Sequence, residues 1–85
     1  MTSEEMLQHA ADIIAERGEA YGDVATSMST IAERWSITLG HAVTPAQVVL
    51  CMIDLKLTRL AHDPTHQDSI ADVIGYAALM PEVTR

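Results

Sequence analysis

The segment from Val48 to Leu60 most constrains how this chain can fold, because it is apolar on nearly every side. Its polar positions are few: Asp54, Lys56, Thr58 and Arg59. A helix that is apolar all round is normally surrounded by other elements. The uninterrupted apolar run, residues 48–53, is far shorter than the ~20 residues that a membrane span needs. We therefore expect this segment to form a helix at the centre of a bundle.

Residues that start and stop helices divide the rest of the chain into three further segments with helical spacing. Thr2 and Glu5 fit a capping box at the start of the first segment, and Gly18 is expected to end it. The other expected boundaries are Asp23 and Gly40 for the second segment, Thr44-Pro45 at the start of the third, and about Gln67 to Met80, before Pro81, for the fourth. No strand pattern competes with these helices. The sequence therefore predicts an all-α fold, a small antiparallel bundle of four helices in a single domain, residues 1–85.

The size and composition of the chain indicate self-association. Its 85 residues allow one compact domain, and 48% of them are hydrophobic. A domain this small buries only about two-thirds of its surface on folding, so a chain this apolar is expected to leave a hydrophobic face exposed. Contact with further copies is the usual way to cover such a face. We expect oligomerisation to complete the bundle, which makes the protein a homo-oligomer.

The charge of the chain excludes some partners. Twelve acidic and five basic side chains give a net charge of −7. DNA phosphates and anionic lipids repel such a chain unless its basic residues are concentrated, so we expect neither a DNA coat function nor membrane binding. Acidic residues stand near the N-terminus where a secretory signal has basic ones, and a single cysteine cannot form an intramolecular disulfide. The expected compartment is the cytoplasm.

Two cations on the apolar third segment are candidate ligand contacts. Lys56 and Arg59 lie about 60° apart around a helix, so they share one strip of its surface. Two like charges on a helix built for burial repel each other and lose solvation. A bound anion would compensate them, because Arg offers a bidentate fork for phosphate oxygens and Lys a point charge. Alternatively, both side chains keep their charged ends in solvent or pair with acids of the fourth segment.

The fourth segment supplies those acids. Asp68 and Asp72 are four residues apart and therefore stack on one helix face, which Tyr76 extends. An acid in the first helical turn, such as Asp68, is favoured by the helix dipole. Asp72 stands among apolar residues, so it either pairs with Lys56 or Arg59 or contributes oxygen to a hard cation such as Mg²⁺. Both alternatives remain open.

The segment from Arg17 to Asp23 is the third candidate, because it combines two glycines, Tyr21 and alternating charges in a tight turn. It either simply ends one helix and starts the next, or it places Tyr21 against a flat ligand. The remaining reactive residue types are expected to be inert. Cys51 is interpreted as a small core residue, and the four histidines as solvated side chains: His9, His41, His62 and His66.

Taken together, these elements resemble a family of small phage and prophage proteins of unknown function. The resemblance covers about residues 13 to 80 and rests on Tyr21-Gly22-Asp23, Ile31-Ala32, Trp35-Ser36 and the segments 55–61 and 68–79. Its most specific parts are the Lys-x-x-Arg element at 56–59 and the Asp-x-x-x-Asp-x-x-x-Tyr element at 68–76. The same elements are similar to the nucleotide-modification-associated domains of phages and, through them, to the MazG-like all-α NTP pyrophosphohydrolases.

The resemblance to MazG-like enzymes implies a Mg²⁺-dependent hydrolysis of a nucleoside triphosphate to a monophosphate and pyrophosphate in the host-cell cytoplasm. It implies Asp68 and Asp72 as metal ligands, and it implies these substrate contacts: Lys56, Arg59, Tyr21 and Tyr76. MazG-like enzymes carry an earlier Glu-x-x-Glu pair; Glu16 and Glu19 have that spacing here, but Gly18 lies between them.

The alternative function is a non-catalytic oligomeric module that binds a host protein or a small nucleotide. In that module, Asp72–Arg59 and Asp68–Lys56 are interhelical salt bridges. The sequence is compatible with both functions and does not establish that the chain is an enzyme.

Overall fold

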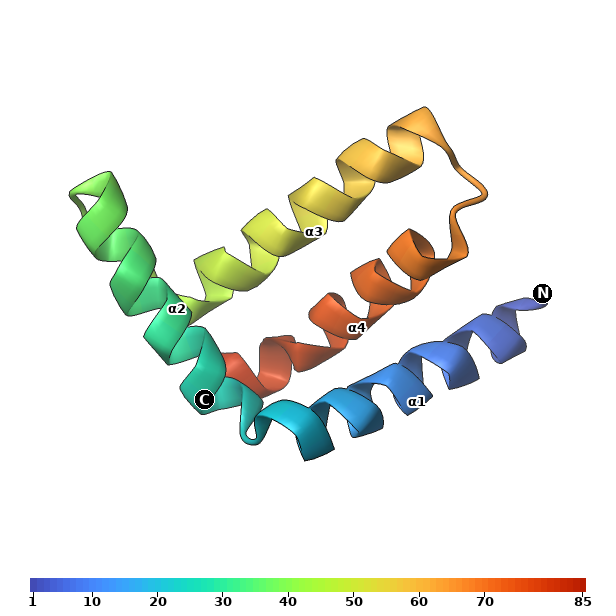
Figure 1. Ribbon diagram of the computed structural model, residues 1–85, viewed down its shortest axis with the longest axis horizontal. Coiled ribbons are helices and arrows are strands. Elements are labelled where there is room, and N and C mark those ends of the chain that lie inside the picture. The colour runs from blue at the N-terminus through green and yellow to red at the C-terminus, as the bar shows by residue number, and fades with distance from the viewer.

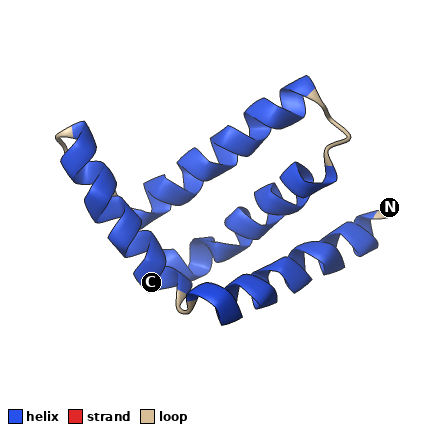
Figure 2. Ribbon diagram, in the orientation of Figure 1, coloured by secondary structure: helices blue, strands red, loops and turns tan.

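The computed structural model describes residues 1–85 and consists of four helices without strands. They are α1 (Ser3–Tyr21), α2 (Val24–Leu39), α3 (Pro45–His62) and α4 (Gln67–Val83). Only short loops and the chain ends lie outside these helices (Figure 2). The prediction of an all-α fold with four helices is confirmed.

Complete capping boxes start two of the helices where the sequence predicts a start. At α1, the Thr2 side chain accepts from the backbone N–H of Glu5, and the Glu5 carboxylate accepts from the backbone of Thr2. This hydrogen bonding lowers the pKa of Glu5 below its usual value. At α3, Thr44 and Gln47 make the equivalent pair of bonds, with proline in the first turn. Local sequence alone is sufficient to place both starts.

Asp23 starts α2 immediately after α1 ends. Its carboxylate accepts hydrogen bonds from the hydroxyl of Thr26 at 2.8 Å and from the backbone N–H of Thr26 at 3.1 Å. These bonds lower the pKa of Asp23, with the hydroxyl as the larger cause. Gly22, with a φ of 78°, is the single residue between the end of α1 and this cap. A left-handed φ favours glycine, so α1 and α2 are joined by a turn that requires it.

Two helices are longer than predicted. The expected end of α1 at Gly18 is wrong, because the helix continues to Tyr21 and the backbone N–H of Gly22 closes it on the carbonyl of Gly18 at 2.9 Å. The expected end of α4 before Pro81 is also wrong, since the helix runs to Val83. A glycine or a proline near a helix end weakens the helix without necessarily stopping it.

The helix α4 is the shared element of the fold. It packs against the other three helices, with α1 and α3 on either side of it, and α1 and α3 do not pack against each other. Figure 1 shows α2 lying across one end of this arrangement. Two small clusters hold the helices together: Met28, Ala32, Val48 and Val49 between α2 and α3, and Met6, Ala10 and Ala71 between α1 and α4.

The expectation that residues 48–60 lie at the centre of the bundle is wrong for the single chain. Val48 and Val49 are fully buried, but Leu50, Leu55 and Leu57 are about half exposed. Cys51, expected in the core, is exposed too. Only one face of α3 therefore meets α2 and α4. The apolar residues on its other face have no partner within the chain.

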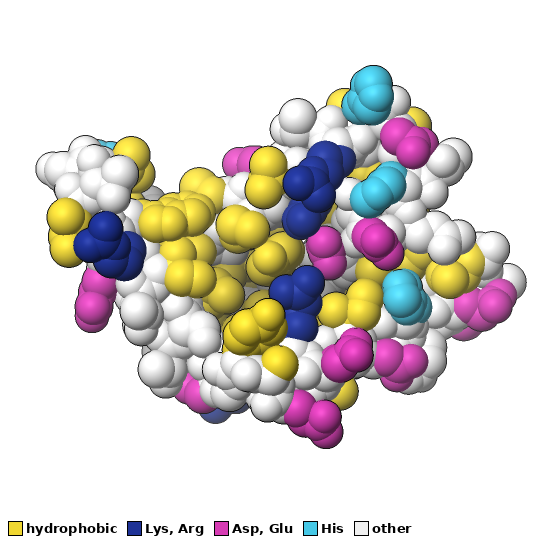
Figure 3. All heavy atoms as spheres, viewed as in Figure 1, with side chains coloured by type: hydrophobic (Ala, Val, Ile, Leu, Met, Phe, Trp, Pro, Cys, Tyr) yellow, Lys and Arg dark blue, Asp and Glu magenta, His cyan; other side chains and the backbone are white.

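The molecule is open for its size. It exposes 5773 Å², whereas a compact protein of this mass exposes about 4,900 Å². Its radius of gyration is 13.6 Å, against about 12 Å for a compact domain of the same length. The face of the molecule seen in Figure 3 is hollowed near its centre, and hydrophobic side chains gather in this hollow. The fold therefore leaves apolar surface that a compact monomer would bury.

Replacing Gly18 with alanine is expected to raise the free energy of unfolding by about 1 kcal/mol, because alanine is the better helix former. Gly18 lies inside α1 without a positive φ, and an added Cβ would meet nothing within 4 Å. Urea unfolding followed by circular dichroism measures the change. Gly22→Ala is the matched control and should lower stability, because the φ of 78° strains a side chain there. Destabilisation by Gly18→Ala would contradict the observed length of α1.

Candidate functional site

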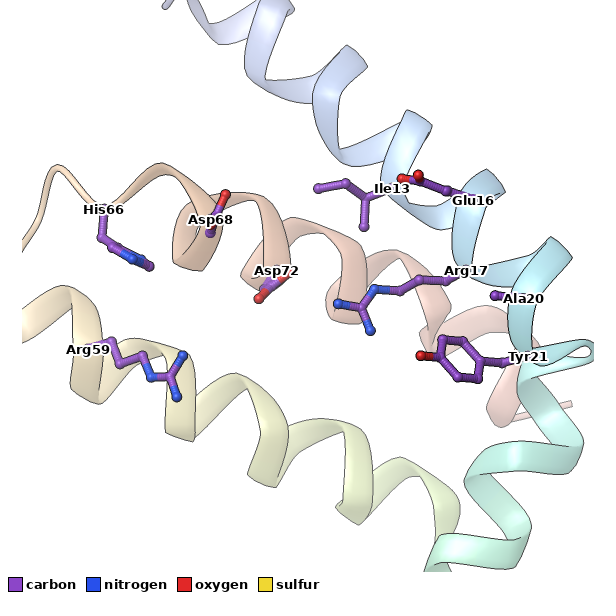
Figure 4. A pocket seen from close by; sticks show the side chains of 9 residues that line it. All are labelled: Ile13, Glu16, Arg17, Ala20, Tyr21, Arg59, His66, Asp68 and Asp72. Carbon is purple, nitrogen blue, oxygen red and sulfur yellow. The ribbon is translucent and has the colours of Figure 1, made fainter.

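A groove on the surface collects charged side chains from three helices. It has a volume of about 660 Å³. Its lining residues are Ile13, Glu16, Arg17, Ala20 and Tyr21 of α1, Arg59 of α3, and His66, Asp68 and Asp72 at the start of α4 and within it (Figure 4). Of the predicted site residues, this groove brings together Tyr21, Arg59, Asp68 and Asp72.

Lys56 and Asp72 form an ion pair between α3 and α4. The Nζ of Lys56 lies 3.2 Å from a carboxylate oxygen of Asp72, and the two side chains are only 13% and 17% exposed. Each charge has therefore lost most of its water and depends on the other for compensation. Of the two alternatives for Asp72, the structure contains the pairing with a cation of the third segment.

The partners of this pairing differ from those expected for a structural role. The pairs Asp72–Arg59 and Asp68–Lys56 do not form. Asp72 pairs with Lys56 instead. Arg59, less than one turn further along α3, stays exposed without an ion pair, as does Asp68 on α4. The groove therefore contains one uncompensated cation and one uncompensated anion from the predicted set.

The two tyrosines occupy different environments. Tyr21 ends α1 at the edge of the groove and is 74% exposed. Figure 4 shows its ring pointing from α1 into the space beside α4. Tyr76 is partly buried and packs against the cluster of Met28, Ala32 and the two valines, and it does not line the groove. Tyr21 is thus available to a ligand in the groove, whereas Tyr76 packs against the residues that join α2 to α3.

Arg17 is a groove residue that the sequence analysis did not single out as a ligand contact. It lies four residues before Tyr21 on α1, so both project from one helix face together with Ile13. In Figure 4 its guanidinium extends from α1 across α4. The spacing was present in the sequence, but it indicates a shared face only if α1 continues past Gly18. The same continuation places Glu16 and Glu19 on one helix, and Glu16 alone of the two lines the groove.

His66 is the second residue that the sequence analysis undervalued. Its ring is exposed, as expected, but it also caps α4. The Nδ1 of His66 accepts from the backbone N–H of Ser69 at 3.2 Å and lies 2.7 Å from the Ser69 hydroxyl oxygen. Ser69 is almost fully buried, with 1% of its surface exposed. A histidine in a loop before a helix carries no obvious capping signal, because Ser, Thr, Asp and Asn are the usual N-caps.

The donors in the groove do not form a metal site on their own. No group of three or more His, Cys, Asp and Glu side chains is placed to hold a metal ion. Asp72 already has Lys56 as its counter-charge, so it can give up an oxygen only by weakening that pair. Asp68 and Glu16 are the groove carboxylates without a cation within ion-pair distance. These residues fit a cation only if a ligand supplies further oxygens.

Comparison with known proteins identifies the family. Residues 5–84 match a domain of unknown function, DUF6378. The chain belongs to this family. It is 34% identical over 80 residues to the Gene 55 protein of Mycobacterium phage L5, and 30% identical over 82 residues to the Gene 55 protein of Mycobacterium phage D29. These alignments cover 92% and 95% of this chain but 51% and 54% of the phage proteins.

The DUF6378 chain thus spans about half the length of the curated relatives it matches. No solved structure matches it. None of its helices is both long enough and apolar enough to span a membrane. The resemblance to a small phage family of unknown function is confirmed. The wider resemblance to MazG-like enzymes stays a prediction.

Asp72→Asn is expected to lower the free energy of unfolding by roughly 3 kcal/mol, because it leaves the charge of Lys56 largely buried and unpaired. Chemical denaturation measures the loss. Asp68→Asn is the matched control. Because Asp68 is exposed and has no ion pair, the free energy of unfolding of this variant should differ from the wild type by less than about 1 kcal/mol. The double variant Lys56→Met/Asp72→Leu should recover most of the stability, since it removes both charges together. Equal effects of Asp72→Asn and Asp68→Asn would contradict the pairing.

Proposed function

We propose that this DUF6378 chain is a phage-derived protein that binds a nucleotide through its phosphates in the groove, in the cytoplasm of the host cell. The observation that carries the proposal is the distribution of cations. The chain has five basic residues and a net charge of −7. Arg17 and Arg59 both line this one groove, and Lys56 pairs with a groove acid beside them. The groove also holds the carboxylates Glu16, Asp68 and Asp72, so the support for an anionic ligand comes from the two arginines, which have no ion pair of their own.

The geometry of the two arginines supports phosphate in particular. Arg17 reaches the groove from α1 and Arg59 reaches it from α3, so a ligand between them is held from two sides. A guanidinium can bind two phosphate oxygens at once, and two such groups suit a ligand with more than one phosphate. Neither arginine has an acidic partner within ion-pair distance, so neither has to break an ion pair to bind.

Tyr21 supports a nucleotide rather than a simple phosphate. Its ring is 74% exposed at the edge of the groove. An exposed aromatic face beside two phosphate-binding groups provides a surface on which a base can stack. Tyr21 and Arg17 lie one turn apart on the same helix face, so base and phosphate would be held by neighbouring side chains.

The proposed ligand is a nucleotide together with a bound Mg²⁺ ion. Proteins commonly hold Mg²⁺ through one or two carboxylates together with substrate phosphates. Asp68 is the better candidate for a carboxylate ligand of Mg²⁺. Asp72 is less available, because its charge is already compensated by Lys56. When bound, Mg²⁺ supplies charge neutralisation to the phosphates. The resemblance to MazG-like enzymes makes a nucleoside triphosphate the first ligand to test and release of pyrophosphate the first reaction.

A panel of nucleoside triphosphates with Mg²⁺ is expected to raise the melting temperature of the protein, and calorimetry should give a measurable Kd for at least one of them. Arg17→Gln and Arg59→Gln should each weaken that binding by about tenfold or more, because each removes a charged hydrogen bond. Arg34→Gln, an exposed change on α2 outside the groove, should leave the Kd unchanged. Pyrophosphate release in the same samples tests catalysis. No thermal shift with any nucleotide would contradict the proposal.

The second candidate function is a non-catalytic oligomeric binding module, and two observations favour it. The Lys56–Asp72 pair is an interhelical salt bridge of the kind such a module needs, although its partners differ from those expected. The exposed surface exceeds that of a compact monomer by roughly 850 Å². A standard interface takes about 800 Å² from each partner. A second copy of the chain would therefore cover the surface that the monomer leaves open.

Self-association is expected through the exposed face of α3. Leu50 and Leu57 lie two turns apart on that face and are about half exposed. Sedimentation equilibrium should show a dimer or larger assembly for the wild type, and Leu50→Glu/Leu57→Glu should shift it to monomer, because two charges cannot be buried there without partners. Leu7→Glu, at an equally exposed leucine of α1, is the control and should not dissociate the assembly. A wild type that is monomeric at high concentration would exclude this candidate.

A further inference from the structure

We infer that the capping hydrogen bonds fix Nδ1 of His66 as an acceptor, so that the ring N–H lies on Nε2, and that His66 presents this N–H to the anionic ligand in the groove. The part that concerns the ligand rests on the proposed function. The part that concerns the tautomer rests on the hydrogen bonds of Ser69 alone. His66 would then be a ligand-binding residue at the end of the groove where Arg59 lies.

The tautomer follows from the direction of one hydrogen bond. The backbone N–H of Ser69 can only donate, and it donates to Nδ1 of His66 at 3.2 Å. Nδ1 must therefore carry a lone pair. The Ser69 hydroxyl lies 2.7 Å from the same nitrogen and must also act as the donor. A neutral imidazole has one N–H, so that N–H is on Nε2.

The burial of Ser69 makes this arrangement rigid. Ser69 is 1% exposed, so water cannot replace His66 as the acceptor for its hydroxyl. Rotation of the imidazole or a change of tautomer would leave a buried donor without a partner. The ring is therefore held from one side by α4, with Nδ1 toward the helix.

The opposite side of the ring faces the groove. His66 lines the groove, and Figure 4 shows its side chain extending into the space between α4 and α3, on the side where Arg59 points. Nε2 has no hydrogen-bond partner within the protein. The donor is therefore fixed in position and available to a ligand that occupies the groove next to Arg59.

The chemistry of the neighbours explains why histidine suits this position. Aspartate would cap α4 equally well, but it would add a further negative charge beside Glu16, Asp68 and Asp72. Serine, threonine or asparagine would cap the helix with shorter side chains. Histidine caps with one ring nitrogen and leaves the other as a donor, so it adds a hydrogen bond for an anion without adding an acid.

The tautomer is tested on the free protein. Labelling with ¹⁵N-histidine and recording long-range ¹H–¹⁵N correlations at about pH 8.5, where an unperturbed imidazole is neutral, should show the Nε2–H form for His66. His62, an exposed histidine at the end of α3, is the internal reference and should show a mixture of tautomers. An Nδ1–H form or a mixture at His66 would overturn the inference, whatever the ligand results are.

The role in binding is tested with His66→Asn. Asparagine is a good N-cap, so the melting temperature should stay close to that of the wild type, while the affinity for ATP with Mg²⁺ should fall by about three- to tenfold, the effect of one neutral hydrogen bond. His66→Ala should lose both stability and affinity, and His62→Asn should change neither. Unchanged affinity in His66→Asn would overturn the ligand role while leaving the proposed function intact. Failure of the wild type to bind any nucleotide would overturn the ligand role together with the proposed function, and the tautomer would still be decided by the NMR result.

Discussion

The ion pair between Lys56 and Asp72 determines what the rest of the molecule can present. It joins α3 to α4, and α4 is the helix against which all the others pack. Because both side chains are largely shielded from water, a shift of one helix along the other would separate two poorly solvated charges. A buried pair of this kind contributes little net stability compared with apolar packing, but a misaligned α3 and α4 would leave both charges poorly solvated and unpaired. The positions of Arg59 and Asp68 at the groove follow from that alignment.

The sequence predicted the local features of the fold well and the tertiary ones less well. The starts at Thr2, Asp23 and Thr44 depend on hydrogen bonds within four residues, so the sequence contains all the information they need. The end of α1 was misplaced because Gly18 lowers helix propensity without excluding helix, and the left-handed residue that ends the helix is Gly22. The role of α3 was misjudged for a different reason. Hydrophobicity indicates that a residue favours burial, but not whether its partner lies in the same chain.

For the candidate site too, the local features were predictable from the sequence and the tertiary ones were not. Tyr21, Arg59, Asp68 and Asp72 were identified by residue type and spacing, and the fold brings them into one groove. The choice of Lys56 as the partner of Asp72 could not be predicted, since it depends on how far α3 and α4 are offset. The two missed residues are Arg17 and His66. Each becomes recognisable only through a structural fact, the continuation of α1 in one case and the burial of Ser69 in the other.

The separation of α1 from α3 has a consequence for how rigid the molecule can be. The two helices make no direct contact and are held in relation to each other only through α2 and α4. A ligand bound by Arg17 of α1 and Arg59 of α3 would bridge these two helices directly, where the protein itself makes no contact between them. Binding of a ligand in the groove would then make the whole fold more rigid.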